Sequence, residues 1–392
     1  VNFNNVKRDV FNNHKDNTTD KNDVDLGYTF SRPTISKVCT QRDPTSKSNP
    51  KACAAGRWVV IFGNGYNSSE ADGAESSADQ AVLYIVDALD GTLLYKFSTK
   101  TGSGLSSPAA VDIDDDDYVD YVFAGDLQGN LWKFDLSDED TKKWGVAYKT
   151  GSFPAPLYTA KSKNDTKQTI TSAPEVILHP DGGMMVMFGT GSYIETTDNA
   201  NVSKQSFYGI RDNNAIVPSA NRNNLVEQIT ATQANYRGIS NNSIDWDKKH
   251  GWYIDLPDGG ERVVSSPRIF GKILAFTSII PEPDPCKNDG RGGAWDYYID
   301  PLTGGSLNWK VIEGSPKTVV IINDISIFFD AGAIKSSMGI SGNPNITIHD
   351  RNHAKAYKEG LDDTQGNPTV QEDPLDLGKT SGRVSWREIL SN

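Results

Sequence analysis

This sequence lacks long apolar runs and an excess of positive charge. Its longest apolar stretches, such as Val319–Ile322, have the length of a strand, whereas a membrane-spanning helix needs about 20 apolar residues. The 392 residues contain 39 Lys and Arg against 51 Asp and Glu, giving a net charge of −12. Nucleic-acid binding is disfavoured because no stripe of Lys and Arg is available to neutralise phosphates. The sequence therefore predicts neither a membrane-spanning segment nor a nucleic-acid partner.

Cysteine is also scarce, with three in the whole chain. Cys39 and Cys53 flank a polar stretch between two strand-like runs, an arrangement that suits a disulfide across a hairpin. The alternative is two free thiols in a cytosolic protein, but the polar, turn-rich composition favours an exported protein and a bridge. Cys286 would then pair outside this chain or stay free. The chain begins with Val and has no signal peptide, so we expect a processed or excised piece of a longer protein.

What the sequence does have is turn residues, with 35 Gly and 19 Pro beside 36% hydrophobic residues. Such a mixture can bury a core and favours an all-β architecture. Residues 1–24 are rich in Asn, Asp and Lys without periodicity, so we expect a flexible lead-in or interblade loop there. The regular part of the chain, residues 25–392, forms the predicted folded domain.

From Asp25 onward the sequence repeats a pattern of four strands. A Pro-led strand is followed by one that ends in Gly, at Gly63, Gly125 and Gly189, a spacing of roughly sixty residues. A third strand carries an aromatic residue before a final Asp, and a fourth follows a turn, as in Leu93–Phe97. We assign the third strands to Leu83–Asp87, Leu131–Asp135, Trp252–Asp255 and Tyr297–Asp300. Four strands per repeat predict β-propeller blades, four of them clear, before a less regular region at 310–392.

An acidic segment separates two of these strands. Asp112, Asp114, Asp116 and Asp120 stand at positions 1, 3, 5 and 9 of a calcium-loop pattern, and Tyr118 at position 7 would offer its backbone carbonyl. Calcium takes six to eight oxygen ligands, and this alternation turns every second side chain toward one point. Because apolar strand-like runs flank the segment, we expect a strand–loop–strand site rather than the helices of an EF-hand. The alternative is a solvated acidic turn.

The loop departs from the EF-hand pattern at two positions. Position 6 is Asp117, where Gly is usual, but Asp tolerates positive φ better than most residues, so the turn can form at some cost. Position 12 is Phe123, so the bidentate Glu is missing and Asp120 must close the site. The replacement of Gly by Asp117 bears on calcium affinity more than on binding itself.

Several segments together resemble a known family: residues 25–33, 57–68, 124–136, 251–256 and 382–388. They look like the C-terminal propeller of PilC/PilY-type proteins of type IV pili. The resemblance implies a modified seven-bladed propeller, so this chain would lack the first blade or two. It also implies calcium binding in an Asp-rich loop, which matches Asp112, Asp114, Asp116, Tyr118 and Asp120 here.

The same resemblance implies an exported, non-enzymatic protein at the pilus tip or outer membrane. Such a protein supports pilus extension against retraction, twitching motility and adhesion to host cells. Its partners would be the minor pilins of the pilus tip and a host-cell receptor.

Two other classes of function stay open. Propellers with Asp-ended aromatic strands and Thr-Gly turns also resemble quinoprotein dehydrogenases, which carry a quinone in the central channel. Those enzymes commonly have an adjacent cysteine pair, which is absent from this sequence. The other class is an integrin-like adhesive module in which the ion is only structural.

Overall fold

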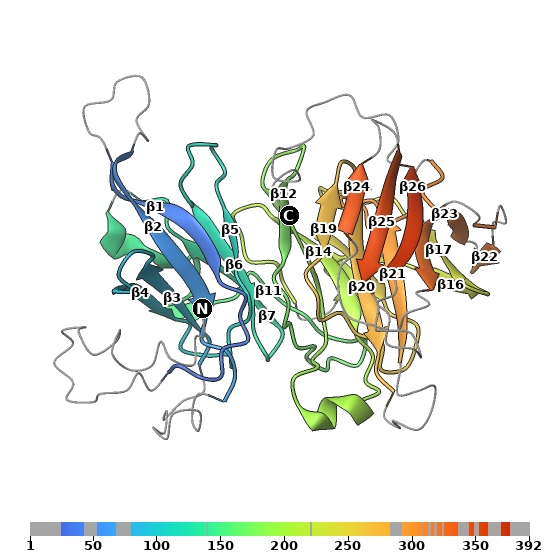
Figure 1. The fold of residues 1–392 in the computed structure, drawn as a ribbon, viewed down its shortest axis with the longest axis horizontal. Coiled ribbons are helices and arrows are strands. Elements are labelled where there is room, and N and C mark those ends of the chain that lie inside the picture. The colour runs from blue at the N-terminus through green and yellow to red at the C-terminus, as the bar shows by residue number, and fades with distance from the viewer. Residues whose placement is uncertain are drawn as a thin grey trace. The chain divides into compact units, whose positions relative to one another are not determined.

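The computed structural model describes residues 25–42, 53–67, 80–138, 140–219, 222–282, 292–307, 309–312, 315–316, 320–323, 325–335, 345–348, 353–359 and 370–376. In these residues the regular elements are β-strands and three short 3-10 helices, η3 (Thr141–Lys143), η4 (Thr196–Ala200) and η5 (Arg222–Asn224) (Figure 1). The chain divides into two compact units. The first comprises Val1–Met184 and Asp212–Asn221, and the second comprises Met185–Arg211 and Arg222–Asn392.

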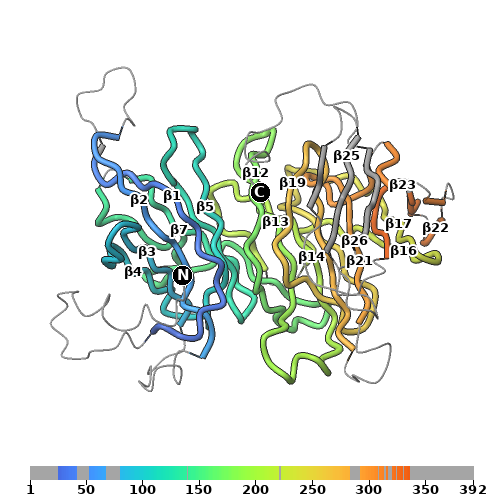
Figure 2. Tube along the Cα trace, in the orientation of Figure 1, coloured from blue at the N-terminus to red at the C-terminus, as the bar shows by residue number. Residues whose placement is uncertain are grey.

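The first unit opens with one regular antiparallel sheet. Its strands follow the chain in order: β1 (Thr34–Arg42), β2 (Cys53–Gly63), β3 (Val82–Asp87) and β4 (Leu93–Ser98). Figure 2 shows them in blue to blue-green. Strand β3 is buried along its whole length, as expected for an inner strand covered on both faces. This is the first of the predicted four-stranded repeats.

A second sheet of the first unit carries the acidic segment. Its main path is β11-β7-β6-β5, and β8 (Gly145–Val146) also pairs with β7. The strands are β5 (Ala109–Val111), β6 (Tyr121–Gly125), β7 (Asn130–Asp135) and β11 (Tyr158–Thr159). A small hairpin of β9 (Tyr148–Thr150) and β10 (Phe153–Ala155) follows, and β12 (Glu175–Leu178) comes later in the same unit. Trp132 of β7 is fully buried and belongs to the apolar core that also contains Ile61 and Ile85 of the first sheet.

The second unit shows one difference from the sequence prediction. After β13 (Met184–Gly189) comes β14 (Ser206–Asp212), which pairs antiparallel with β18 (Gly251–Asp255), and β15 (Val226–Gln228) pairs parallel with β18. The predicted third strand, Trp252–Asp255, is therefore preceded in the sheet by β14. The glycine inside β14 has a packing reason, because a Cβ on Gly209 would lie 2.3 Å from the Trp252 ring.

The largest sheet of the second unit has the order β16-β17-β23-β21-β20-β19, with β22 (Val320–Ile322) paired to β23. Its strands are β16 (Thr230–Gln233), β17 (Tyr236–Ser240), β19 (Arg268–Phe270), β20 (Ile273–Ile280), β21 (Gly293–Ile299) and β23 (Ile325–Lys335). Stacked aromatic rings fill its core, with Phe276 and Tyr297 4.5 Å apart between ring centroids. A further antiparallel sheet consists of β24 (Asn345–Ile348), β25 (His353–Glu359) and β26 (Val370–Asp376).

The recurring glycines predicted from the sequence have a shared structural role. A Cβ on each would lie 2.2 to 2.3 Å from the chain that leads to a later Pro-led strand: Leu105 for Gly63, Ile170 for Gly125 and Val263 for Gly189. The residue after each glycine accepts a hydrogen bond from the same crossing chain. Asn64 Oδ1 accepts from the Leu105 N–H. The carbonyls of Asp126 and Thr190 accept from the N–H groups of Ile170 and Val263. The glycines are therefore required because the crossing chain, through a backbone carbonyl at Gly63 and through side chains at Gly125 and Gly189, leaves no space for a Cβ.

Three sequence predictions lie outside the described residues. These are the lead-in at residues 1–24, the fate of Cys286 and the segment at 382–388 that contributes to the family resemblance.

Candidate metal site

The acidic segment is the connection between two paired strands. Strands β5 and β6 pair antiparallel, with Val111 opposite Tyr121. The Asp120 N–H donates to the Val111 carbonyl at 2.9 Å, which closes the neck of the loop. The strand–loop–strand arrangement predicted from the sequence is thus confirmed.

Three of the predicted ligands come together in this loop. One carboxylate oxygen from each of Asp112, Asp114 and Asp116 lies within 4.8 Å of the others. Calcium–oxygen distances are about 2.3–2.6 Å, so two oxygens bound to one ion lie at most about 5 Å apart. The three carboxylates are hard oxygen donors at a spacing that a single hard cation can span. This group could therefore hold a metal ion.

The fourth predicted carboxylate has a different setting. Asp120 is only 1% exposed, and its Oδ2 accepts a hydrogen bond from the Ile113 N–H at 2.9 Å. Its carbonyl accepts from the Leu136 N–H at 2.7 Å. Asp120 is not a member of the group of three. Its observed contacts join the end of the loop to its beginning and to the segment after β7.

The shape of the loop depends on backbone donors and on two left-handed residues. Asp112 accepts hydrogen bonds from the N–H groups of Asp117 at 2.8 Å and Asp116 at 3.3 Å, which bend the chain around its carboxylate. Asp115 has φ of 60° and Asp117 has φ of 69°. Position 6 of the loop thus takes the turn that usually calls for Gly, as expected from the sequence. The cost is small because Asp is among the residues that enter this region most readily.

The hairpin of β1 and β2 supports the loop, a contact that sequence reasoning missed. The Val119 N–H donates to the Lys37 carbonyl at 2.9 Å. The Tyr118 ring lies against Gly56, where a Cβ would be 2.2 Å from the ring, and the Lys37 ammonium is 5.9 Å from the ring centroid. A lone glycine inside a strand can indicate such a close approach, and Gly56 was that signal.

A disulfide closes the same hairpin. Cys39 and Cys53 are bonded, with their Cα atoms 5.7 Å apart, and the predicted pairing is confirmed. In the strand register Cys39 lies opposite Gly56, the residue against which Tyr118 packs. The bridge therefore restrains the part of the hairpin on which the acidic loop rests.

At the end of β6 lies a carboxylate of another kind. Asp126 is fully buried, and its oxygens accept hydrogen bonds from Trp132 Nε1, Asn130 Nδ2 and the N–H groups of Gln128 and Asn130 at 2.8 to 2.9 Å. Burial raises the pKa of Asp126 to about 6, although the four donors oppose this shift. Asp126 fixes the turn between β6 and β7, and its setting is that of a structural group.

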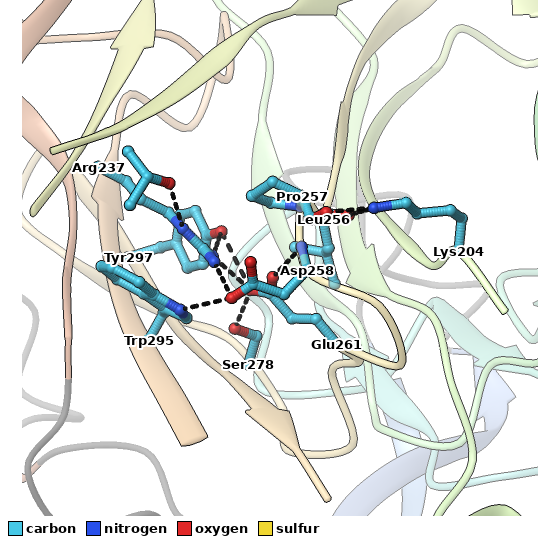
Figure 3. Close-up of polar contacts among 10 residues, drawn as sticks. Lys204, Arg237, Leu256, Pro257, Asp258, Glu261, Ser278, Trp295 and Tyr297 are labelled. Carbon is cyan, nitrogen blue, oxygen red and sulfur yellow. Dashed lines mark hydrogen bonds and ion pairs between the residues drawn. The ribbon is translucent and has the colours of Figure 1, made fainter. Parts of the chain in front are cut away.

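The second unit contains a dense charged cluster around Arg237 (Figure 3). The Arg237 side chain is fully buried and donates to Glu261, also fully buried, and to Asp258, each at 2.6 Å. The Arg237 guanidinium lies 3.8 Å from the Trp295 ring centroid. Burial raises the pKa of the Tyr297 hydroxyl well above its usual range, so this group stays protonated and donates to Glu261 at 3.2 Å. The cluster ties the Asp258–Glu261 loop to the sheet, with its carboxylates bonded to a cation of the chain itself.

Comparison with known proteins identifies the family. A model described as the PilY1 beta-propeller domain matches residues 3–243. The chain belongs to the PilY1 β-propeller family. This membership confirms the all-β propeller class that the strand repeats predicted.

Curated relatives agree with this assignment. A type IV pilus biogenesis factor PilY1 homolog from Xylella fastidiosa is 33% identical over 94% of this chain and 26% of its own length. The type IV pilus biogenesis factor PilY1 of Pseudomonas aeruginosa (strain UCBPP-PA14) is 30% identical over 94% of this chain and 33% of its length. The chain therefore spans about a quarter to a third of the length of these relatives.

A solved structure is similar as well. The C-terminal domain of Pseudomonas aeruginosa PilY1 matches with a TM-score of 0.65 and 27% identity, covering 91% of this chain and 74% of that domain. Among the residues described for this PilY1-family chain, no helix is long and apolar enough to cross a membrane.

Proposed function

We propose that the loop from Asp112 to Asp120 binds calcium. The observation that carries this proposal is the gathering of the Asp112, Asp114 and Asp116 oxygens within 4.8 Å at the bend between two paired strands. In the proposed site these three carboxylates are ligands, the Tyr118 carbonyl is a fourth, and Asp120 closes the set. The donor set suits calcium because it consists of hard oxygens on a flexible loop.

Neighbouring residues of the chain hold the proposed ligands in position. Backbone N–H groups that donate to Asp112 hold the bend, and the Lys37 carbonyl holds Val119 at its exit. Bound calcium would supply positive charge that offsets the repulsion among neighbouring carboxylates. An ion shifts a conformational equilibrium only as far as it prefers one state. The loop and the hairpin it rests on are therefore the elements whose shape calcium would bias.

For the whole chain we propose the role of a C-terminal propeller in a type IV pilus biogenesis factor. This role rests on family membership and on the pilus-biogenesis function for which the curated relatives are named. The domain, residues 25–392, would act at the pilus tip or outer membrane, preceded by a lead-in at residues 1–24. Through contacts with minor pilins it would support pilus extension against retraction and twitching motility, and it would bind a host-cell receptor.

Calorimetric titration of calcium tests the site. The parent should bind calcium, Asp112→Ala should lose most of the affinity, and Asp115→Asn should keep it because it removes a charge without removing a proposed ligand. Asp120→Ala distinguishes two roles of Asp120. A large loss of calcium affinity would identify Asp120 as a ligand, whereas a small loss would show that it only holds the two ends of the loop together. Binding in both Asp112→Ala and Asp120→Ala at the parent's affinity would place the site elsewhere.

Cell-based measurements test the role. Bacteria carrying Asp112→Ala in the full-length protein should show altered twitching motility, whereas Asp115→Asn bacteria should behave as the parent. Equal host-cell binding with and without a chelator would support a purely structural ion, as in an integrin-like module. The proposed role is not enzymatic, so dye reduction with alcohol, pyrroloquinoline quinone and calcium should show no turnover.

A further inference from the structure

The first unit contains a fully buried pair of a lysine and an aspartate. Lys133 Nζ lies 2.8 Å from Asp212 Oδ2, and the two side chains are 2% and 0% exposed. Lys133 is in the middle of β7, and Asp212 is the last residue of β14. Both belong to the first unit, because residues 212–221 cluster with it. A primary amine and a carboxyl group thus meet out of reach of bulk water.

Aromatic rings enclose this pair. Lys133 Nζ lies 3.9 Å from the centroid of Tyr121, 5.7 Å from that of Tyr148 and 5.8 Å from that of Phe123. The rings fix the direction from which the amine approaches the carboxyl group. Although Nζ is 2.8 Å from Oδ2, no described group makes a hydrogen bond of ordinary geometry to that oxygen. The amine therefore approaches the carboxyl group outside the usual hydrogen-bonding direction.

Tyr148 places a proton donor on the other oxygen of the same carboxyl group. Its hydroxyl donates to Asp212 Oδ1. Burial, reinforced by this hydrogen bond, raises the pKa of Tyr148 above its usual range, so the hydroxyl stays protonated. A donor on one carboxyl oxygen draws electron density from the carbon and stabilises negative charge that develops there.

We propose that Lys133 and Asp212 condense to an intramolecular amide bond. Within the pair, a proton passes from the ammonium to the carboxylate, giving an amine and a carboxylic acid without net charge transfer. The lone pair of Nζ attacks Asp212 Cγ while Tyr148 stabilises the oxygen that gains charge. The C–O bond then breaks, the leaving hydroxyl takes a proton from the nitrogen, and one water molecule is released. No oxidant, reductant or cofactor takes part.

Two other lysine–aspartate pairs in the chain serve as internal comparisons. Lys96 and Asp25 are also 2.8 Å apart, but their side chains are 28% and 19% exposed. Lys161 and Asp165 are 2.9 Å apart, with 21% and 67% exposure. The distances of the three pairs agree within 0.1 Å, whereas the burial of the side chains differs. Water that reaches the two exposed pairs solvates both groups and disfavours the release of a water molecule, so we expect an amide only between Lys133 and Asp212.

The test is mass spectrometry of the folded protein, purified natively and then reduced and denatured. We expect a mass lower than that of the sequence by one water molecule, and a protease digest that contains one branched peptide joining the Lys133 and Asp212 segments. A mass equal to that of the reduced sequence, with linear peptides only, would overturn the proposal. Water loss located at Lys96 or Lys161 would overturn it as well, because burial would then not be the cause.

Variants separate the chemistry from the packing. Lys133→Arg should show the full mass, because a guanidinium does not condense. Asp212→Asn should lose one ammonia in place of one water, since the amide nitrogen becomes the leaving group. Tyr148→Phe keeps both reacting groups and should slow formation of the bond in freshly refolded protein. If Tyr148→Phe links as fast as the parent, the assigned role of Tyr148 is wrong even where the bond is present. The proposal is independent of calcium binding, and Asp112→Ala should carry the same bond.

Discussion

The acidic loop of the first unit and the Arg237 cluster of the second are both rich in carboxylates, but they are held in different ways. In the loop, backbone N–H groups reach Asp112 and the carboxylates lie in a bend that is partly exposed. In the cluster, one buried guanidinium reaches both Glu261 and Asp258. The cation of the cluster is a side chain of the protein itself, so the carboxylates it pairs with are a fixed part of the folded structure. A bend shaped by neutral donors keeps its negative charge and can respond to an ion that comes from solution.

The largest effect should come from removing the built-in cation. Arg237→Met leaves Glu261 buried without its partner, and such a loss costs about 3–5 kcal/mol. We expect this decrease in the free energy of unfolding of the second unit, measured by denaturant titration. The control is Lys248→Met, which breaks the ion pair with Asp245 between side chains that are 77% and 49% exposed and should have a much smaller effect, because exposed pairs contribute little. Equal losses in the two variants would contradict the distinction between the buried and the exposed pair.

Asp126 offers a third case, a buried carboxylate with only neutral donors around it. Its pKa is raised from 3.8 to about 6, so the folded state binds a proton more tightly than the unfolded chain. Its contribution to stability is therefore greatest below pH 4 and is lost as the pH rises through about 6, a change of about 3 kcal/mol. Between pH 4.5 and pH 7 this change amounts to about 2 kcal/mol, and Asp126→Asn should lack it when unfolding free energies at the two pH values are compared. The same pH dependence in parent and variant would show that Asp126 does not titrate in this range.

Calcium should stabilise the first unit and leave the second unaffected. At a calcium concentration one hundred times the Kd, the increment is about 2.7 kcal/mol. We expect a higher midpoint of thermal unfolding in calcium than in chelator for the parent and for Arg237→Met, and no difference for Asp112→Ala. An increment that survives in Asp112→Ala would point to ions bound elsewhere on this acidic protein.

The smallest effect concerns strain in the loop. Asp117 has φ of 69°, a conformation that Gly adopts more readily. Asp117→Gly should bind calcium more tightly than Asp117→Asn by less than about 1 kcal/mol, because both variants lose the same charge and only Gly relieves the backbone. Calorimetry of the two variants gives this difference directly. Weaker binding by the Gly variant would mean that the Asp117 side chain stabilises the turn.

Features set by neighbouring residues could be predicted from the sequence. The alternation of aspartates indicated the bend between β5 and β6, and the short spacing of Cys39 and Cys53 indicated their bridge. Recurring glycines and aromatic strands indicated the propeller repeats. In each case the pattern lies within one segment, where spacing alone decides which side chains can meet.

Features that join distant segments could not be predicted in this way. Strand β14 was missed because Gly209 looks unfavourable in a strand until the Trp252 ring is placed against it. The Arg237 and Glu261 pair and the Lys133 and Asp212 pair each depend on how separate elements pack. Nothing in the local sequence of Lys133 distinguishes it from a surface lysine. The support of the acidic loop by the hairpin escaped notice for the same reason, since Gly56 gives no indication of its partner Tyr118.

The close crossings at Gly63, Gly125 and Gly189 have a consequence for how repeats can be exchanged between related proteins. At each of them a crossing stretch of chain leaves no space for a Cβ, through the Leu105 carbonyl at Gly63 and through the Ile170 and Val263 side chains at the other two. A glycine is therefore needed whichever repeat the joint serves. Recombination at these joints would exchange whole repeats while leaving the strand pairs inside each repeat untouched. Related proteins could thereby acquire different outer loops by exchanging repeats, provided that each exchanged repeat retains its glycine.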